Sequence, residues 1–318
     1  MPQEIPLHCP LCRAQLPAPT ITGIDRLFGV PGQFEISVCA GCGAGVTLPI
    51  LVEAQLSAFY PDNYDAYTVA SGRTMSLLLR LYHAWRDRLT LRTPPLSVLR
   101  GSRPGRLLDV GCGKGEPSAL LIRYGWQVFG VDPSPRACEL AGQRGIEATT
   151  GTLQTAEFDS ESFDAILFHH SLEHVSDPLD DLERAARLLR PGGMILVSVP
   201  NFGSWQRKRF GTYWTALDLP RHRTHFTAAA LRSALETRGF RECSSSTQTT
   251  FSILPLTLQF AVFGRPIFRG TISRRLMMGA YLLLFPFSLL ANLLGRGGDA
   301  LTVVATRPEV GASPASSP

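Results

Sequence analysis

The sequence predicts an α/β protein built on a doubly wound, mostly parallel sheet. The main observation is that short apolar runs alternate with amphipathic segments between residues 104 and 249, which is the pattern that repeated β–α units produce. A second observation is the glycine-rich segment DVGCGKG, residues 109–115, which follows one of these runs and opens a predicted helix. The crossovers of such units are right-handed by the usual rule.

The composition indicates a folded protein in a reducing compartment. Hydrophobic residues make up 44% of the 318 residues and charged residues 18%, which favours a packed core. The net charge of +5 is a mild bias, whereas nucleic-acid-binding proteins usually concentrate far more basic charge. The start, MPQEIPLHCP, lacks the basic and apolar regions of a secretory signal. We therefore expect a cytoplasmic protein whose seven cysteines are thiols or metal ligands.

Residues 1–50 predict a small metal-stabilised module. Two C-x2-C pairs, CPLC and CAGC, are separated by residues 13–38. Each pair can hold one tetrahedral ion from adjacent turns, and four thiolates leave no open position for catalysis. We predict one structural Zn2+ held by Cys9, Cys12, Cys39 and Cys42. Disulfides are the alternative for the same spacing.

Residues 51–103 are predicted to form a helical connector. Its strongest element is TMSLLLRLYHAWRDRL, residues 74–89. Apolar side chains repeat there at helical spacing, at Leu78, Leu81, Tyr82, Trp85 and Leu89. We expect this helix to pack on the domain that follows.

The main domain begins at residue 104. Four apolar runs predict buried parallel strands, namely RLLDVG (106–111), WQVFGVD (126–132), FDAILFHH (163–170) and MILVSVP (194–200). Three segments between them predict helices, namely EPSALLIRY (116–124), PRACELAGQR (135–144) and PLDDLERAARLLR (178–190), the last ended by Pro191-Gly192-Gly193.

The C-terminal part of this domain has a helix and two strands. TAAALRSALETRG predicts a helix with Thr227 as its N-cap and Gly239 beyond its end. RECSSSTQTT (241–250) and DALTVVATR (299–307) predict strands. The domain therefore comprises residues 104–249 and 298–308, and the polar tail of residues 309–318 is expected to be disordered.

The glycine loop and Asp132 predict a nucleotide-type ligand. Glycines let the backbone turn sharply and let a ligand approach closely, and a carboxylate at the end of the second strand can accept hydrogen bonds from both ribose hydroxyls. A dinucleotide fingerprint requires a third glycine three positions after Gly113, where Glu116 stands. A carboxylate there repels a pyrophosphate. S-adenosylmethionine has no phosphate and meets no such objection.

The same segment resembles motif I of class I S-adenosylmethionine-dependent methyltransferases. GVDPSP resembles the ribose-binding turn of that family, FDAILFHHSLEHVSDP its fourth strand and following loop, and LLRPGGMILVSVPN its fifth-strand junction. The resemblance covers roughly residues 105–245 in the family's order. It implies a seven-stranded Rossmann-like sheet whose last strand is antiparallel.

The resemblance also implies roles for particular residues. Asp109 and Gly111, with Gly113 and Gly115 in the same loop, would hold the methionine part of the cofactor, and Asp132 would hold the ribose. Thr152 and Leu153 would border the adenine, and His169 or His170 would line the floor beneath the methyl-bearing sulfur.

Methyl transfer from a sulfonium is an in-line displacement, so the protein mainly aligns the acceptor and excludes water. A hydroxyl or acidic carbon acceptor also needs a base, for which histidine has a suitable pKa. Of the candidates His170, Glu173, His174, His222 and His225, we expect His174 and Glu173 to lie closest to the methyl group.

The acceptor is expected to be a small or lipid-linked metabolite. The segment after the fourth strand, HHSLEH, lacks the motifs for methylating DNA bases. A cluster of Arg207, Lys208, Arg209, Arg221, His222 and Arg223 suits an acidic acceptor. The four-cysteine module ahead of the domain resembles bacterial methyltransferases of antibiotic-sugar and surface-polysaccharide pathways. The alternatives are a zinc-containing ribosomal RNA methyltransferase and a catalytically inactive cofactor-binding scaffold.

Residues 250–297 form an apolar helical insertion before the last strand. Twenty uncharged residues lie between Arg275 and Arg296, enough for a membrane span. A single crossing would separate two paired strands of one sheet, and the preceding apolar run, FSILPLTLQFAVF, is too short to return. We therefore expect a helical pair that enters one leaflet from the inner face, or one buried against the protein or a second copy of the chain. Flanking arginines would meet anionic headgroups, namely Arg265, Arg269, Arg274, Arg275 and Arg296.

Overall fold

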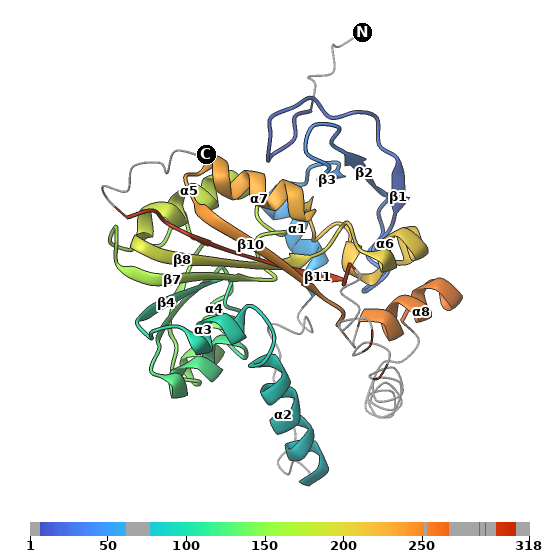
Figure 1. The fold of residues 1–318 in the computed structure, drawn as a ribbon. Coiled ribbons are helices and arrows are strands. Elements are labelled where there is room, and N and C mark those ends of the chain that lie inside the picture. The colour runs from blue at the N-terminus through green and yellow to red at the C-terminus, as the bar shows by residue number, and fades with distance from the viewer. Residues whose placement is uncertain are drawn as a thin grey trace.

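The computed structural model describes residues 7–61, 77–250, 253–266, 286, 290 and 297–309. Its centre is a seven-stranded sheet in the order β10-β11-β8-β7-β4-β5-β6 (Figure 1). The five parallel strands are β4 (Arg106–Val110), β5 (Gln127–Asp132), β6 (Glu147–Thr150), β7 (Phe163–His169) and β8 (Leu189–Pro200). The predicted α/β fold is confirmed.

The last strand runs antiparallel, as the family resemblance implied. β11 (Ala300–Thr306) lies between β8 and β10 (Arg241–Gln248) and is antiparallel to both. Its residues are almost all buried, because it sits inside the sheet. β10 is mostly exposed and forms the edge, which agrees with its serine-rich sequence.

The two faces of the sheet carry different helices. Alternate residues of β7 contribute to two separate apolar clusters, Ile166 and Phe168 to one and Ala165 and Leu167 to the other. The first cluster includes side chains of α5 (Pro178–Leu188) and α7 (Ala228–Thr237). The second includes side chains of α3 (Leu96–Gly101), α4 (Pro135–Gly142) and the 3₁₀ helix η3 (Ser118–Tyr124). A period-2 strand pattern buried on both faces is what a doubly wound sheet requires.

Most of the predicted boundaries in this domain are close to the observed ones. Thr227 is the N-cap of α7 and its hydroxyl accepts from the Ala230 amide. EPSALLIRY is helical but forms a 3₁₀ helix, and it ends at Gly125, which has a φ of 91°. Pro191-Gly192-Gly193 does not stand before β8 but within it. The register against β7 jumps from Phe163↔Leu189 to Ala165↔Met194, so the strand accommodates the three residues as a bulge.

The N-terminal module is a second, four-stranded sheet in the order β1-β2-β3-β9. β1 (Ile21–Gly23), β2 (Phe34–Val38) and β3 (Gly45–Leu48) come from the module itself. β9 (Thr224–His225) comes from the segment that follows β8 and pairs antiparallel with β3. The module is therefore joined to the main domain by strand pairing as well as by packing. A short α1 (Glu53–Leu56) and the 3₁₀ helix η1 (Ser57–Phe59) follow it.

The connector helix α2 spans Leu77–Thr90. Figure 1 shows that it extends away from the sheet. Its C-terminal end meets the domain, where Arg86 lies 3.6 Å from Glu116. The buried residues that follow, Leu91, Leu96 and Leu99, belong to the apolar cluster on the α3 side of the sheet. The helix is confirmed, whereas the predicted packing of Leu78, Leu81 and Tyr82 lies outside the described side chains.

The segment between β8 and β9 forms α6 (Trp205–Phe210) and the 3₁₀ helices η4 (Gly211–Tyr213) and η5 (Thr215–Leu217). Against them packs α8 (Ile253–Phe263), the first part of the apolar insertion, with Leu254 and Phe260 buried. The opposite side of α8 exposes Leu258, Val262 and Phe263. Apart from positions 286 and 290, the predicted membrane-entering stretch of residues 276–295 lies outside the described residues. Within the described part of the chain, every helix is too short or too polar to span a bilayer.

Candidate functional site

The glycine loop lies at the carboxyl end of β4, at the centre of the sheet. Gly111, Gly113 and Gly115 all have φ values between 51° and 72°, a region that favours glycine. A Cβ on Gly111 would lie 2.5 Å from the Ser171 Cβ, and one on Gly115 would lie 2.3 Å from Ile146 Cδ1. The predicted loop is therefore present, and the packing of Ser171 and Ile146 leaves no room for a side chain at Gly111 or Gly115.

Asp109 is the last residue but one of β4, two positions before Gly111. Its side chain is 2% exposed, and among the described residues nothing donates a hydrogen bond to its Oδ1. Burial raises the pKa of Asp109 to about 7; the Ser118 hydroxyl opposes this shift, and the nearby Asp132 charge contributes to it. A buried carboxylate oxygen without a donor is costly. A bound ammonium would satisfy it, so the site fits the amino group that the sequence assigned to Asp109.

Asp132 ends β5 and faces the same loop. Its carboxylate accepts from the Gly113 amide (2.9 Å) and the Ser134 amide (2.9 Å), which fix its position and leave lone pairs for ribose hydroxyls. The turn after β6 lies beside it, since Asp132 pairs with Thr150 and the Gly151 amide donates to the Asp132 carbonyl. Leu153 is buried and Thr152 exposed in this turn. The predicted ribose and adenine residues thus lie at neighbouring strand ends.

The loop after β7 holds the other predicted residues. His169 is the last residue of β7, and burial lowers its pKa to about 3. Ser171 packs against Gly111 and donates to the Val110 carbonyl (2.5 Å), which fastens this loop to the glycine loop. His170 follows in the left-handed region with φ of 55°, and its Nδ1 lies 3.4 Å from Glu173 Oε1.

Glu173, His174 and His222 form a cluster below this loop. Their ligand atoms lie within 4.8 Å of one another. Burial lowers the pKa of His174 to about 4. Burial opposes the charge of Glu173, but His170 and the neighbouring rings of His174 and His222 outweigh it and lower the pKa of Glu173 to about 2.

His225, the last predicted base, lies in β9 away from this cluster's centre. Its Nε2 donates to the Thr47 hydroxyl (2.9 Å), because that hydroxyl itself donates to the His222 carbonyl (2.6 Å). Burial lowers the pKa of His225 to about 3. His225 is therefore a neutral link between the N-terminal module and the main domain.

The four cysteine sulfurs are brought together as predicted. Cys9 and Cys42 Sγ are 3.6 Å apart, Cys12 and Cys39 Sγ are 3.4 Å apart, and all four lie within 4.8 Å. Four sulfurs about 2.3 Å from one tetrahedral ion would be about 3.8 Å apart, so the cluster fits such an ion.

The two cysteine turns have the same geometry. In each, the first cysteine's amide donates to an alanine carbonyl five residues on, Cys9 to Ala14 and Cys39 to Ala44 (both 2.8 Å). The residue after each second cysteine, Arg13 and Gly43, is left-handed. Two matching turns facing each other are a suitable frame for one shared ion.

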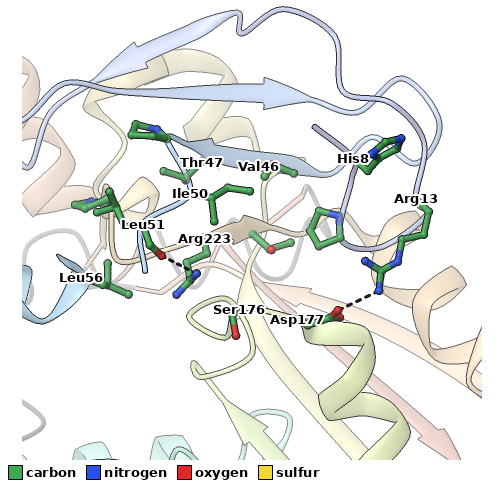
Figure 2. A pocket seen from close by; sticks show the side chains of 14 residues that line it. His8, Arg13, Val46, Thr47, Ile50, Leu51, Leu56, Ser176, Asp177 and Arg223 are labelled. Atoms are coloured by element: carbon green, nitrogen blue, oxygen red, sulfur yellow. Dashed lines mark hydrogen bonds and ion pairs between the residues drawn. The ribbon is translucent and has the colours of Figure 1, made fainter. Parts of the chain in front are cut away.

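A cavity of about 180 Å³ lies between the module and the main domain. Figure 2 shows Thr47 and Ile50 on the module side and Ser176 and Asp177 on the opposite side, with Arg13 reaching across to Asp177 (3.0 Å). Arg223 also borders the cavity and donates to the Leu51 carbonyl. The cavity does not include the glycine loop or the Glu173 cluster.

The predicted basic cluster is divided by the fold. Arg221 is fully buried and pairs with Asp25 (2.8 Å) and Asp218 (2.6 Å), and His222 is also buried. Arg223 pairs with Glu53 (2.6 Å). Lys208 and Arg209 are exposed on α6. The sequence does not indicate two further residues of this region, Asp25 and Tyr60. The Tyr60 hydroxyl lies 3.0 Å from His174 Nδ1. Neither residue has a local sequence pattern that indicates a distant partner.

The sheet order, the glycine loop and the two carboxylates define the class, which is that of S-adenosylmethionine-dependent methyltransferases. Residues 77–244, just over half of the chain, match the family model described as "Methyltransferase domain", and the chain belongs to this family.

The chain is similar to relatives of known name and to solved structures. The ubiquinone biosynthesis O-methyltransferase of Xanthomonas oryzae pv. oryzae is 35% identical over 130 residues, covering 38% of this chain and 54% of the relative. The protein of the same name from Cereibacter sphaeroides is 36% identical over 124 residues, covering 36% and 50%. The matches thus span about half the length of these relatives. A SAM-dependent methyltransferase structure from Archaeoglobus fulgidus aligns with a TM-score of 0.47 at 15% identity, covering 73% of this chain and 100% of that one.

Proposed function

We propose that the protein transfers a methyl group from S-adenosylmethionine to an oxygen of a small or lipid-like acceptor. The observation that carries the proposal is Asp109, a buried carboxylate that stands beside the glycine loop and has one oxygen without a hydrogen-bond donor among the described residues. When bound, S-adenosylmethionine supplies an activated methyl group. Asp109 and the loop would bind its methionine part, Asp132 its ribose, and Thr152 and Leu153 would border its adenine.

The proposed acceptor class rests on the names of the relatives and on the pairing of the basic residues. The named relatives are O-methyltransferases of ubiquinone biosynthesis, which supports a hydroxyl on a lipid-like molecule. A sugar-type hydroxyl, which the four-cysteine module suggested, is the second acceptor class to test. RNA is less favoured, because Arg221 and Arg223 are neutralised by carboxylates within the fold.

Among the candidate bases we propose His170 for the proton of the acceptor hydroxyl. Its side chain is 44% exposed, whereas Glu173 is 1% exposed, so His170 can reach a substrate. The Glu173 carboxylate, 3.4 Å away, would stabilise the imidazolium that forms. His174 and Glu173 would then support the site from behind rather than touch the transferred proton.

The first experiment is calorimetric titration with S-adenosylhomocysteine, followed by assays with S-adenosylmethionine and three acceptor sets: hydroxylated aromatic rings carrying polyprenyl tails, sugar nucleotides, and ribosomal RNA. We expect binding, and transfer to the first set. Transfer to RNA alone would replace the proposal with the ribosomal one. Binding without transfer to any acceptor would identify a scaffold, and absence of binding would refute the cofactor assignment.

His170→Gln separates the role of the base from binding. It should leave S-adenosylhomocysteine affinity unchanged and lower kcat by about 100-fold, the usual range for a general base. His225→Gln is the matched control in a buried, structural position. If His170→Gln keeps full kcat, another group takes the proton.

We also propose that the four cysteines hold one structural Zn2+. The sulfur spacings and the matching turns support this. Protein purified without chelator should contain about one equivalent of zinc at these thiolates, and Cys39→Ser should lose it. Cys243→Ser, a cysteine outside the cluster, is the control. Zinc retained in Cys39→Ser, or absent from the intact protein, would contradict the proposal.

A further inference from the structure

Three side chains from two separate segments converge below the loop after β7. Glu173 and His174 follow β7, and His222 precedes β9. One carboxylate oxygen and one nitrogen from each ring lie within 4.8 Å of one another. The backbone holds the segments together, since the Glu173 carbonyl accepts from the amides of Arg223 (2.8 Å) and Thr224 (3.2 Å). The cluster is thus fixed by the main chain.

Backbone carbonyls set the tautomer of both rings. His174 Nδ1 lies 3.1 Å from the Arg221 carbonyl oxygen, and His222 Nδ1 lies 2.9 Å from the Ala216 carbonyl oxygen. A carbonyl oxygen can only accept, so each Nδ1 must carry the hydrogen. In a neutral ring Nε2 is then a bare lone pair. Both rings therefore have only an acceptor left for the cluster.

The carboxylate of Glu173 adds further acceptors and no donor. Glu173 is 1% exposed, and neither of its oxygens receives a hydrogen bond from the described residues. Nε2 of His222 lies 3.9 Å from Oε1, beyond hydrogen-bonding distance. Nδ1 of the partly exposed His170 lies 3.4 Å from the same oxygen without the geometry of a hydrogen bond. A buried anion facing two lone pairs is strongly unfavourable unless a cation sits among them.

We propose that Glu173, His174 and His222 bind a divalent first-row transition-metal ion. Two imidazole nitrogens with one carboxylate favour zinc, manganese, iron or cobalt over magnesium and calcium, which prefer oxygen ligands alone. Ligands on opposite sides of an ion at about 2.1 Å are about 4.2 Å apart. The observed cluster therefore closes on an ion with side-chain shifts of under about 1 Å.

The hydrogen bonds from Nδ1 to backbone carbonyls are what metal-binding histidines commonly make. Such partners fix the ring orientation and raise the basicity of the liganding nitrogen. Tyr60 adds a second contact to His174 Nδ1, at 3.0 Å. Tyr60 follows the N-terminal module, and His222 is tied to Thr47 of that module through its carbonyl, so the module would buttress two of the three ligands.

The ion would lie next to the proposed methyl-transfer site. Ser171, two residues before Glu173, packs on Gly111 of the glycine loop. Three protein ligands leave coordination positions open, as in catalytic metal sites, and an acceptor oxygen could occupy one of them. This role rests on the proposed function, whereas binding of the ion does not.

The experiment uses the full chain with its cysteine cluster loaded with zinc. Mn2+ is then titrated and followed by the loss of its free-ion electron paramagnetic resonance signal. We expect about one equivalent of Mn2+ to bind, since imidazole and carboxylate accept it and thiolates do not favour it. Glu173→Gln and His222→Gln should each weaken binding by about 100-fold or more, beyond the loss from removing an outer partner. His8→Gln, an exposed histidine outside the cluster, is the matched control.

A second probe, Co2+ exchanged for zinc in the full chain so that it occupies both sites, distinguishes the two sites in the same protein. Co2+ bound to thiolates gives intense sulfur-to-metal charge-transfer absorption, whereas Co2+ at nitrogen and oxygen ligands gives only weak visible bands. The weak bands should disappear in Glu173→Gln while the charge-transfer bands remain. S-adenosylhomocysteine binding by each variant reports that the domain is folded.

The proposal is overturned if the zinc-loaded protein binds no Mn2+ or Co2+, or if both variants bind as the intact chain does. If metal binds but methyl transfer is unaffected by it, the ion is structural and only its suggested role fails. If S-adenosylhomocysteine does not bind the intact chain while Mn2+ does, the proposed function fails and the metal site stands.

Discussion

At the scale of single residues, the buried carboxylate of Asp109 determines the electrostatics of the proposed cofactor site and its expected dependence on pH. Its pKa is raised to about 7, mainly by burial, above the usual value of about 3.9 for an unfolded chain. In the free protein this group therefore favours folding below about pH 3.9 and opposes it increasingly as pH rises towards 7. A bound ammonium reverses the preference, because it pairs only with the ionised carboxylate.

We therefore predict that S-adenosylhomocysteine affinity falls as pH drops below about 7, approaching tenfold per pH unit. Calorimetry in two buffers of different ionisation enthalpy should show one proton released on binding below that pH. Asp109→Asn should bind weakly, without this pH dependence. Asp132, whose pKa burial also raises, is tested in parallel as Asp132→Asn. An affinity of the intact chain that is flat from about pH 5.5 to 8 would contradict the assignment.

Arg221 is a buried charged group like Asp109, but its charge is paired with carboxylates. Its guanidinium donates to Asp25, Asp218 and the Phe59 carbonyl, and none of it is exposed. Asp25 also accepts from the amides of Leu27 and Phe28. The group connects the N-terminal module with the segment before β9.

Arg221→Met should lower the free energy of unfolding by about 3–5 kcal/mol, since it leaves buried carboxylates without their cation. Chemical denaturation measures this directly. Arg209→Met, an exposed arginine on α6, should change stability by less than about 0.5 kcal/mol. Adding Asp218→Asn to Arg221→Met should recover part of the loss. Equal effects of the two arginine substitutions would show that the buried network contributes little.

The contrast between these residues explains what could be predicted from the sequence at this scale. Asp109, Asp132 and the four cysteines were found because a local pattern, a glycine loop or a C-x2-C pair, indicates them. The sequence assigns Arg221 to a basic cluster that suits an acidic acceptor, because its neighbours along the chain are basic. Its true partners are Asp218, three residues away, and Asp25, which is far away in sequence. Burial of a charge depends on such distant partners and leaves no local signal.

At the scale of elements, the glycine loop links β4 to the loop after β7. Gly111 leaves no room for a Cβ, because Ser171 Cβ stands 2.5 Å from where it would lie. Ser171 is in turn fastened to the Val110 carbonyl. The cofactor loop and the segment that carries His170 and Glu173 are thus packed as one unit.

Gly111→Ala should therefore destabilise the protein and weaken cofactor binding together. A φ of 70° costs a β-carbon residue about 1–2 kcal/mol, and the clash adds to this. Gly142→Ala is the matched control, since nothing lies within 4 Å of its Cβ position and it ends α4 in an ordinary conformation. Thermal unfolding and calorimetry measure the two effects. A Gly111→Ala protein as stable as Gly142→Ala would contradict this packing.

The elements themselves were largely predictable, and the exceptions have physical causes. Strands β4, β5 and β7 and helices α4, α5 and α7 follow hydrophobic periodicity, which local sequence encodes. β9 has only two residues and forms because β3 offers an edge to pair with, so no pattern could reveal it. Pro191-Gly192-Gly193 normally interrupts a strand, but pairing of the Gly192 and Gly193 backbone with Arg307 holds it within β8.

At the scale of the whole molecule, the apolar insertion connects the end of β10 to the start of β11, and these two strand ends are paired with each other. Gln248 of β10 pairs with Ala300 of β11, and Gly298 packs directly on Gln248. Asp299 accepts from Thr250 and Gln206 and closes the base of the insertion. Both ends must lie on the same side of any membrane, as the sequence predicted, because they are hydrogen-bonded to each other.

The described part of the insertion explains where an apolar surface begins. α8 buries Leu254 and Phe260 against the 3₁₀ helices η4 and η5, and Thr257 bonds Thr215 there. Towards its C-terminal end Val262 is 69% exposed and Phe263 53% exposed. In the sequence, the uncharged stretch of residues 276–295 follows this end of α8. We propose that this surface enters one leaflet of an anionic membrane, with flanking arginines contributing about 1 kcal/mol each.

Replacing residues 267–296 by a short Gly-Ser linker should abolish this association and leave the enzyme domain intact. The hydrogen bonds at the base and the packing of α8 are retained, so S-adenosylhomocysteine binding should be unchanged. Co-sedimentation with liposomes containing anionic lipid measures the association, and it should weaken as salt screens the arginines. Val262→Ser with Phe263→Ser tests the end of α8 separately. The membrane proposal is contradicted if the intact chain does not sediment with these liposomes and instead forms a dimer that the deletion dissociates. In that case the insertion covers a second copy of the chain, because the same apolar surface must be buried between proteins rather than in lipid.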